Sequence, residues 1–379
     1  MKIRILEEAR VIMSNKDNPF HGYFAWPSVT RLPDGRLAAV ASGFRLGHIC
    51  PFGKAVICYS ADEGKTWTKP APVIDTPLDD RDAGITPFAD GKVIVTSFNN
   101  TFDFQRKSIN GTHGSSDDTV KKYINAYLDM AEERDKNEHI EEKYLGSTYV
   151  ISDDGGNTFG EIKKLPITNP HGPCTLPDGR LLYVGTRRDL RRNAEDYPDM
   201  LECHISDMDG NFTYLSSISN VKEHSESGQI LASHEPHAIA LPDGRILVHI
   251  RTEPNFTLFQ SESTDGGKTF SEPVRLLPDA GGAPSHLMLH SSGKLIATYG
   301  YRQKPYGIRV MVSDDLGKTW KEKALSLYET DNSPDLGYPC SVELSDGSIL
   351  TVFYSRSGIS GWEIGTPCEI YQTVWKLEE

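Results

Sequence analysis

The stretch Ser60-Ala61-Asp62-Glu63-Gly64-Lys65-Thr66-Trp67 decides the fold, because its pattern Ser-x-Asp-x-Gly-x-Thr-(Trp/Phe) occurs four times in the 379-residue chain. The other copies begin at Ser152, Ser263 and Ser313. Each copy follows a short alternating apolar run, such as Ala55 to Tyr59, and is therefore expected to be the turn that ends a strand. Glycine permits a positive φ there, and the Asp, Ser and Thr side chains can bind the amides of the turn. We interpret these residues as structural rather than catalytic.

A second repeat joins two apolar strands through a hairpin of the Asp-Gly type, and it occurs six times. The turns are Pro33-Asp34-Gly35, Ala89-Asp90-Gly91, Pro177-Asp178-Gly179, Pro242-Asp243-Gly244, Ser291-Ser292-Gly293 and Ser345-Asp346-Gly347. Most neighbouring turns lie about 50 to 65 residues apart, which is a period typical of propeller blades. The sequence therefore predicts an all-β fold, a six-bladed β-propeller with four-stranded antiparallel blades.

The last blade is one strand short, and the N-terminal stretch Ile3 to Met13 is expected to supply the missing strand. This closure would leave no open sheet edge between the first and last blades. The whole chain, residues 1–379, is expected to form one propeller domain. A helical insertion in the second blade, residues 101–146, interrupts it: Asp117 to Asp135 carries apolar side chains at helical spacing. We expect this helix to pack on the blades and to cover part of the site.

Composition excludes several partners. The net charge of -13 argues against binding to nucleic acid or to an anionic membrane. The charged N-terminus, Met1 to Val11, does not resemble a signal peptide, and no later segment is apolar enough to span a membrane, so we expect a soluble cytoplasmic protein. The six cysteines have no CxxC spacing, which indicates neither a zinc site nor a disulfide framework, and we expect no cofactor.

Both kinds of turn are expected on one face of the propeller, so the site should lie on the opposite face. The second strands end there with Arg45, Asn99 and Asn100, Arg187 and Arg188, Arg251, Arg302 and Arg356. Guanidinium groups around one end of the axis of an acidic protein indicate a local site for a carboxylate or phosphate. Alternatively, each arginine pairs with a neighbouring Asp or Glu.

The first strands begin on the same face with Trp26, Arg81 and Asp82, His171, Glu235 and His237, Ser285 and His286, and Tyr338. Carboxylates, a phenol and imidazoles near one axis are the groups that glycosyl transfer uses to protonate a leaving oxygen and to attack or stabilise the sugar cation. A phenol needs a nearby base to become a nucleophile, so a contact between Tyr338 and Glu235 would be informative. The histidines lack metal-ligand spacing and are interpreted as polar lining of the axis.

These features resemble the sialidase superfamily, whose members carry the Ser-x-Asp-x-Gly turns, or Asp-boxes, on six-bladed propellers. Gly337-Tyr338-Pro339-Cys340-Ser341, followed by Glu343-Leu344-Ser345-Asp346-Gly347, resembles the family's segment with the nucleophilic tyrosine. His234-Glu235, followed by Leu241-Pro242-Asp243-Gly244-Arg245 and then Arg251, resembles the segment with the activating glutamate and a carboxylate-binding arginine. Arg302 is a looser match to another arginine of that triad, and Ala38 to Arg45 resembles the strand that leads to a further substrate-side arginine.

The chain departs from the family at two positions. Ala25-Trp26-Pro27 stands where the family has Arg-Ile-Pro, so the first arginine of the triad is missing. After Arg45, where the family has its catalytic aspartate, the chain reads Leu46-Gly47-His48-Ile49-Cys50-Pro51 without an acid. The resemblance thus implies Tyr338 and Glu235 as catalytic residues, with Asp82 or His48 as a replacement acid. The expected substrate-binding residues are Arg45, Arg81, Arg251, Arg302, His171, His237 and Trp26.

Three functions follow from this reading, and each implies a carbohydrate partner. The first is an exo-acting glycosidase for an acidic sugar of the sialic or uronic type, with the arginines holding the anion. The second is a uronate lyase, in which His48, His171, His237 or Tyr338 would abstract the proton at C5. The third is a propeller that binds carbohydrate without turnover.

Overall fold

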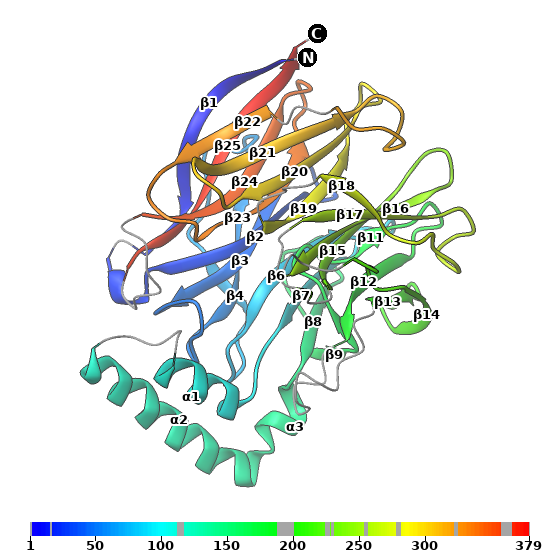
Figure 1. Cartoon of the computed structure of the whole chain (residues 1–379). Coiled ribbons are helices and arrows are strands. Elements are labelled where there is room, and N and C mark those ends of the chain that lie inside the picture. Colours follow the sequence, from blue (N-terminus) through cyan, green and yellow to red (C-terminus); the bar gives the residue numbers. More distant parts are fainter. Residues whose placement is uncertain are drawn as a thin grey trace.

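The computed structural model describes residues 2–15, 17–111, 117–187, 201–223, 228, 231–253, 257–277, 282–321, 325–357 and 366–378. The strands in these ranges form a β-propeller of antiparallel units (Figure 1). Apolar side chains pack between adjacent units: Val184 of one sheet, for example, belongs to the same buried cluster as Val248 and Ile250 of the next.

Three of the sheets have four strands each. They are β6 (Arg81–Pro87), β7 (Val93–Phe98), β8 (Ser147–Ser152) and β9 (Lys163–Leu165); β15 (Ala232–Ala240), β16 (Ile246–Glu253), β17 (Leu258–Ser263) and β18 (Val274–Leu277); and β19 (Gly282–Leu289), β20 (Leu295–Tyr301), β21 (Tyr306–Ser313) and β22 (Leu325–Thr330). A fourth sheet has β10 (Ile167–Thr168) and β11 (Cys174–Thr175) both paired with β12 (Leu181–Arg187), followed by β13 (Leu201–Ser206) and β14 (Phe212–Ile218). In this sheet the first strand is therefore split in two.

The remaining sheet has eight strands where two separate blades were expected. Its members are β23 (Leu336–Glu343), β24 (Ile349–Arg356), β25 (Cys368–Glu378), β1 (Lys2–Met13), β2 (Tyr23–Arg31), β3 (Leu37–Arg45), β4 (Lys54–Ser60) and β5 (Ala71–Ile74). One parallel pair, Tyr23 with Cys368, joins the two halves into a single sheet. As predicted, β1 pairs antiparallel with β25, from Lys2 opposite Glu378 to Met13 opposite Ile370.

The four repeated turns are held by the hydrogen bonds that their residue types predict. In the first, Ser60 Oγ donates to Asp62 at 2.8 Å and accepts from the Gly64 amide at 2.9 Å, while Thr66 donates through both its amide and its hydroxyl to Asp62. The other three turns repeat these bonds. The bond from Thr66 is the main cause that lowers the pKa of Asp62 to about 2. These side chains are occupied in the turns, so their role is structural.

The insertion between β7 and β8 forms α1 (Phe102–Asn110), α2 (Asp118–Glu138) and α3 (Ile140–Tyr144), while the short helix η1 (Pro19–His21) precedes β2. Asp117 caps α2 by accepting bonds from two amides of its first turn. The buried face of α2, including Ile124 and Leu128, packs with Leu46 and Cys50 of the loop after β3. Figure 1 shows the three helices together at one edge of the strand array. No helix in the described part of the chain has the length and hydropathy that crossing a membrane requires.

Candidate active site

The first strands of four units share the same backbone distortion. We use the word mouth for the region around their four distorted residues. Their left-handed residues are Trp26 (φ 56°), Asp82 (φ 49°), Glu235 (φ 44°) and Tyr338 (φ 50°). At each of them the pairing with the second strand shifts register, which marks a β-bulge. A positive φ costs a residue with a side chain about 1 to 3 kcal/mol, and such strain clusters at functional sites. The bulges therefore mark the four positions as a candidate site.

Tyr338 and Glu235 meet in this mouth, although 103 positions separate them in the chain. The Tyr338 hydroxyl donates to Glu235 Oε1 at 2.5 Å. Arg251 Nη1 donates to the other carboxylate oxygen of Glu235 and, at 3.2 Å, to the Tyr338 hydroxyl. The contact predicted between the phenol and its base is thus present, and Arg251 holds both groups.

The electrostatics of the pair place the proton on the phenol while the site is empty. Burial raises the pKa of Tyr338 well above its usual value, and the neighbouring Glu235 charge raises it further. Burial also opposes ionisation of Glu235, but Arg251 and the bond from Tyr338 outweigh it, so the pKa of Glu235 is lowered. Glu235 is therefore a carboxylate ready to accept the Tyr338 proton.

Arg251 and Arg302 differ in how their charges are compensated. Arg251 is paired with Glu235 and, at 2.6 Å, with Glu253. Arg302 donates to neutral groups, the Leu336 carbonyl at 3.1 Å and the Tyr354 hydroxyl at 2.9 Å. Within the described residues Arg302 forms no ion pair with a carboxylate, and this leaves its charge available for an anion.

Arg81 also lacks a carboxylate partner among the described residues. Its guanidinium lies 4.4 Å from the centre of the Trp26 ring and donates to His48 Nε2 at 3.3 Å. Its Nε is buried and has no hydrogen-bond partner in the described part of the chain. A buried donor without a partner is costly, so a ligand oxygen at this place would relieve that cost.

Asp82 lies close to these groups. Its amide donates to Ser42 Oγ at 2.9 Å, and its side chain is buried. Burial is the main cause that raises the pKa of Tyr338 and that of Tyr183, and the charge of Asp82 raises both further, so its carboxylate lies near both phenols. The structure therefore brings both replacement acids, Asp82 and His48, to the site.

Two of the expected substrate contacts prove to be structural. Arg45 is fully buried (0% exposed) and pairs with Asp79 at 2.6 Å. Its three nitrogens also donate to the carbonyls of Gly47, His48 and Asp80, so each nitrogen of the guanidinium is engaged within the fold. Trp26 is 1% exposed, because the guanidinium groups of Arg45 and Arg81 and the rings of neighbouring aromatic residues cover it. It supports the site rather than contacting a sugar.

The expected substrate contacts His171 and His237 lie beneath the site with His286. The three ring centroids lie 4.4 to 5.4 Å apart. His237 follows Glu235 by two residues, which places it about 7 Å further along the strand, away from the mouth. Burial lowers the pKa of each, to about 3 for His286, so all three are neutral. They form a buried cluster of neutral imidazoles, and their role as polar lining of the axis stays a prediction.

The other members of the predicted ring serve the fold or are not described. Arg356 lies 3.7 Å from Asp335, and Asn99 binds the Tyr144 carbonyl and the Gly146 amide at the end of the insertion. The side chain of Arg187 and all of Arg188 lie outside the described residues. The alternative reading, in which arginines pair with nearby acids, thus holds for Arg45, Arg251 and Arg356.

Sequence reasoning missed Tyr23, Asp335 and Tyr354. The Tyr23 and Tyr354 hydroxyls both donate to the buried Asp335, at 3.0 Å. Asp335 precedes Tyr338 by three residues, and Tyr354 precedes Arg356 by two, so both stood beside positions that the sequence singled out. No group of three or more His, Cys, Asp or Glu side chains in the described ranges is arranged to hold a metal ion.

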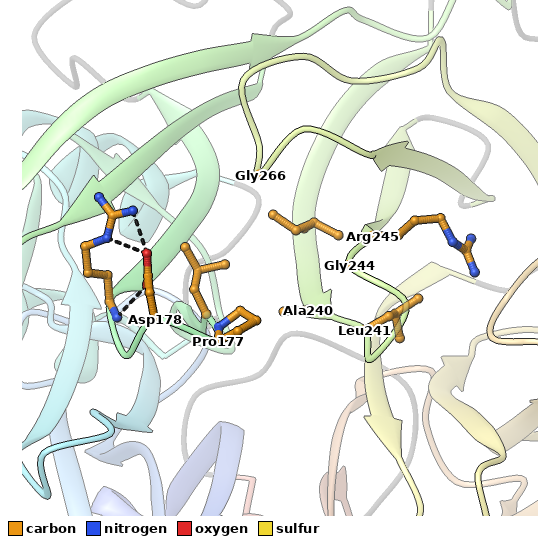
Figure 2. Close-up of a pocket in the computed structure, with 10 residues that line it drawn as sticks. Pro177, Asp178, Ala240, Leu241, Gly244, Arg245 and Gly266 are labelled. Carbon is orange, nitrogen blue, oxygen red and sulfur yellow. Dashed lines mark hydrogen bonds and ion pairs between the residues drawn. The ribbon is translucent and has the colours of Figure 1, made fainter.

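A pocket of about 230 Å³ lies on the opposite face, between the hairpin turns at Asp178 and Gly244 (Figure 2). Its charged side chains are already paired: Arg180 with Asp178 at 2.6 Å, and Arg245 with Asp243 and Glu262. The charges of these two arginines are thus compensated within the turns. The bulged mouth is therefore the better candidate for chemistry.

Comparisons with known proteins agree with this geometry. Residues 134–352 match the family described as BNR repeat-like domain. A protein of unknown function from Dyadobacter fermentans has a similar structure, with a TM-score of 0.74, 21% identity and 99% of both chains covered. The NanB sialidase from Streptococcus pneumoniae follows with a TM-score of 0.65, 14% identity, and 97% of this chain and 70% of that one covered. The Penicillium chrysogenum alpha-L-arabinanase complexed with arabinobiose gives 0.59, 15%, 97% and 98%. No curated protein sequence matches significantly.

The fold and its bulged first strands define a sialidase-like β-propeller. The chain belongs to the BNR repeat-like domain family, whose match covers more than half of its length.

Proposed function

We propose that the protein is an exo-acting glycosidase that cleaves an acidic sugar, with Tyr338 as nucleophile and Glu235 as its base. The observation that carries this proposal is the 2.5 Å hydrogen bond from the Tyr338 hydroxyl to Glu235, formed between bulges of two different blades. A tyrosine held against an ionised carboxylate can attack an anomeric carbon while its proton moves to that carboxylate. Structural neighbours that are sialidases support the same chemistry.

In the first step the Tyr338 oxygen forms a bond to the anomeric carbon and Glu235 takes the phenolic proton. The bond to the leaving oxygen breaks as that oxygen receives a proton from the acid of the site, Asp82 or His48. Because the resting pKa values keep the proton on Tyr338, the transfer must accompany bond formation rather than precede it. In the second step water attacks the same carbon and gives one proton back to Asp82 or His48, while the proton on Glu235 returns to the departing Tyr338 oxygen. The configuration at the anomeric carbon is then retained.

An acidic substrate is favoured by the two arginines without carboxylate partners. Arg302 and Arg81 both lie within the group of side chains around Trp26, Tyr338 and Tyr354. In the described part of the chain neither forms an ion pair with an Asp or Glu. A sugar carboxylate would supply the missing counter-charge through charge-assisted hydrogen bonds.

The test is a screen of sialosides, uronosides and neutral aryl glycosides, followed by variants on the best substrate. We expect Tyr338→Phe and Glu235→Gln each to lower kcat by about 10² to 10⁴-fold, the range typical of a lost catalytic proton transfer. Tyr59→Phe is a matched control, because Tyr59 donates to the Gly156 carbonyl in a repeated turn, away from the mouth. Full activity of the Tyr338 and Glu235 variants would overturn the assignment.

A uronate lyase is the second candidate, and one observation favours it. His48 Nε2 accepts a bond from Arg81, so a neutral imidazole stands beside an arginine, as elimination next to a carboxylate requires. Elimination leaves a conjugated double bond that absorbs in the ultraviolet, whereas hydrolysis does not. Treating uronate oligosaccharides and following this absorbance separates the two reactions.

We further propose that the eight-stranded sheet functions as two blades, which makes the propeller six-bladed, and that the protein acts in the cytoplasm. The first statement is supported by the single residue pair that joins the two halves of that sheet. The second is supported by the sequence alone, and fractionation of the native host would test it.

A further inference from the structure

The hydrogen bonds around His48 determine which of its nitrogens carries the proton. Tyr23 has one hydroxyl proton and donates it to Asp335, at 3.0 Å, so its oxygen accepts from His48 Nδ1 at 3.4 Å. Arginine can only donate, so His48 Nε2 accepts from Arg81 at 3.3 Å. In the empty site His48 is therefore neutral, with its proton on Nδ1.

The two sides of this imidazole act on its charge in opposite directions. On the Nδ1 side, the hydrogen bonds through Tyr23 to the Asp335 carboxylate favour a positive imidazolium. On the Nε2 side, the Arg81 cation disfavours it and occupies the site where the second proton would bind. Among the described residues, other charged or titratable groups near the ring are Asp82, which follows Arg81 in the chain, and Tyr338, which contacts the same Trp26 ring as His48. Arg356 lies near Asp335, and Arg45, the ion-pair partner of Asp79, donates to the His48 carbonyl.

We propose that Arg81 sets the protonation state of His48 and that binding of the substrate to Arg81 changes this state. While the site is empty, Arg81 keeps His48 neutral. When the anionic group of a substrate binds Arg81, the guanidinium leaves His48 Nε2 and its charge is compensated, so His48 takes a proton from solvent. His48 then becomes the acid of the reaction, and only an anionic substrate switches it on. This inference rests on the proposed glycosidase function.

The proton balance of the reaction closes with these groups. As the Tyr338 oxygen bonds to the anomeric carbon, His48 Nε2–H protonates the departing oxygen and Glu235 takes the phenolic proton. The attacking water later gives one proton to His48 Nε2 and its OH group to the sugar, while Glu235 returns its proton to Tyr338. When the acidic product leaves, Arg81 returns to His48, which releases its extra proton to solvent. Tyr23 and Asp335 act as positioning residues for His48.

The test is an NMR titration of the full chain with labelled histidine rings, in which a His48→Gln variant assigns the signal. Arg81→Met removes the cation and the donor, and we expect the midpoint of the His48 titration to move to higher pH by about one pH unit or more. Tyr23→Phe removes the acceptor at Nδ1, so its midpoint should move to lower pH. Arg36→Met, on the turn face where Arg36 pairs with Asp34, is the matched control and should leave the midpoint unchanged.

Carboxylated sugars supply the second measurement. Glucuronic acid and a 2,3-unsaturated sialic acid, neither of which can be hydrolysed, should raise the midpoint in the unmodified protein but not in Arg81→Met, and glucose should not raise it. An unchanged midpoint in Arg81→Met overturns the control by Arg81 whether or not any sugar binds. If both acidic sugars leave the spectrum undisturbed, the acidic substrate of the proposed function is wrong, while the ligand-free titration still decides the role of Arg81.

Discussion

The Arg45 and Asp79 pair allows a sharp test of which arginines serve the fold. Both side chains are 0% exposed, and their nearest atoms are 2.6 Å apart. Removing one partner of a buried ion pair leaves the other charge unpaired, which costs about 3 to 5 kcal/mol. We therefore expect Arg45→Met to lower the free energy of unfolding by about this amount, a large fraction of the about 5 to 15 kcal/mol typical of a folded domain. Urea unfolding followed by tryptophan fluorescence measures it.

Two further variants separate the ion pair from other effects. Arg45→Met combined with Asp79→Asn removes both charges and should recover much of the loss, because no unpaired charge remains. Gly53→Ala keeps both charges but places a methyl group against Arg45 Nη1 and Asp79 Oδ1, so it should destabilise the protein as well.

Arg302→Met is the contrasting variant, since Arg302 has no carboxylate partner in the described residues and binds two neutral groups. It should cost about 1 to 2 kcal/mol of stability and should raise KM for acidic sugars. The reasoning would be refuted if Arg45→Met unfolded at the same urea concentration as the unmodified protein but lost affinity for acidic sugars.

Three more predictions concern stability. The pKa of His286 is about 3 in the folded protein, below its unfolded value, so the contribution of the neutral ring to the free energy of unfolding is complete above about pH 6.5 and is lost as the pH falls. Between pH 7 and pH 5 the loss amounts to about 2 kcal/mol. In thermal melts, His286→Asn should therefore show a stability that depends less steeply on pH. Gln372 accepts from Trp67 Nε1 at 2.7 Å and donates to the Gly64 carbonyl at 2.9 Å, so it ties the first repeated turn to β25. Gln372→Leu should therefore cost about 2 to 4 kcal/mol in urea unfolding. A change below about 0.5 kcal/mol would show that these two bonds do not stabilise the turn. Asp117→Ala removes the cap of α2 and should cost about 1 kcal/mol while kcat stays unchanged, and a large fall in kcat would show that the insertion takes part in catalysis.

The sequence predicted best what depends on neighbours along the chain. Ser60, Asp62 and Thr66 lie within seven residues, so their types alone determine the bonds of the turn. Hairpins of the Asp-Gly type likewise indicate two paired strands, and the repetition of these local units indicates a propeller. Even Tyr338 and Glu235, far apart in the chain, were expected to meet, because both stand at the same position of their repeats.

Pairing between side chains could not be predicted in this way. Arg45 and Arg302 occupy equivalent strand ends, yet Arg45 meets the buried Asp79 while Arg302 meets only neutral oxygens. The difference arises from the loop between β5 and β6, which carries Asp79 and whose path no repeat specifies. The state of His48 depends on Asp335, 287 positions later in the chain, through the hydroxyl of Tyr23. Such contacts follow from packing in three dimensions and have no periodic signature.

The junction of the two halves of the eight-stranded sheet has a consequence for how the protein is made. Tyr23 and Trp26 leave the ribosome before Asp335, Tyr338 and Tyr354 do, because they precede them in the chain by about 300 residues. Their contacts, including those of Tyr23 and Tyr354 with Asp335, form only when the two ends of the ring meet. A nascent chain can therefore build its middle blades early and still lack these contacts of the candidate site. Activity would appear in a single late event, so its appearance during translation would report directly on ring closure.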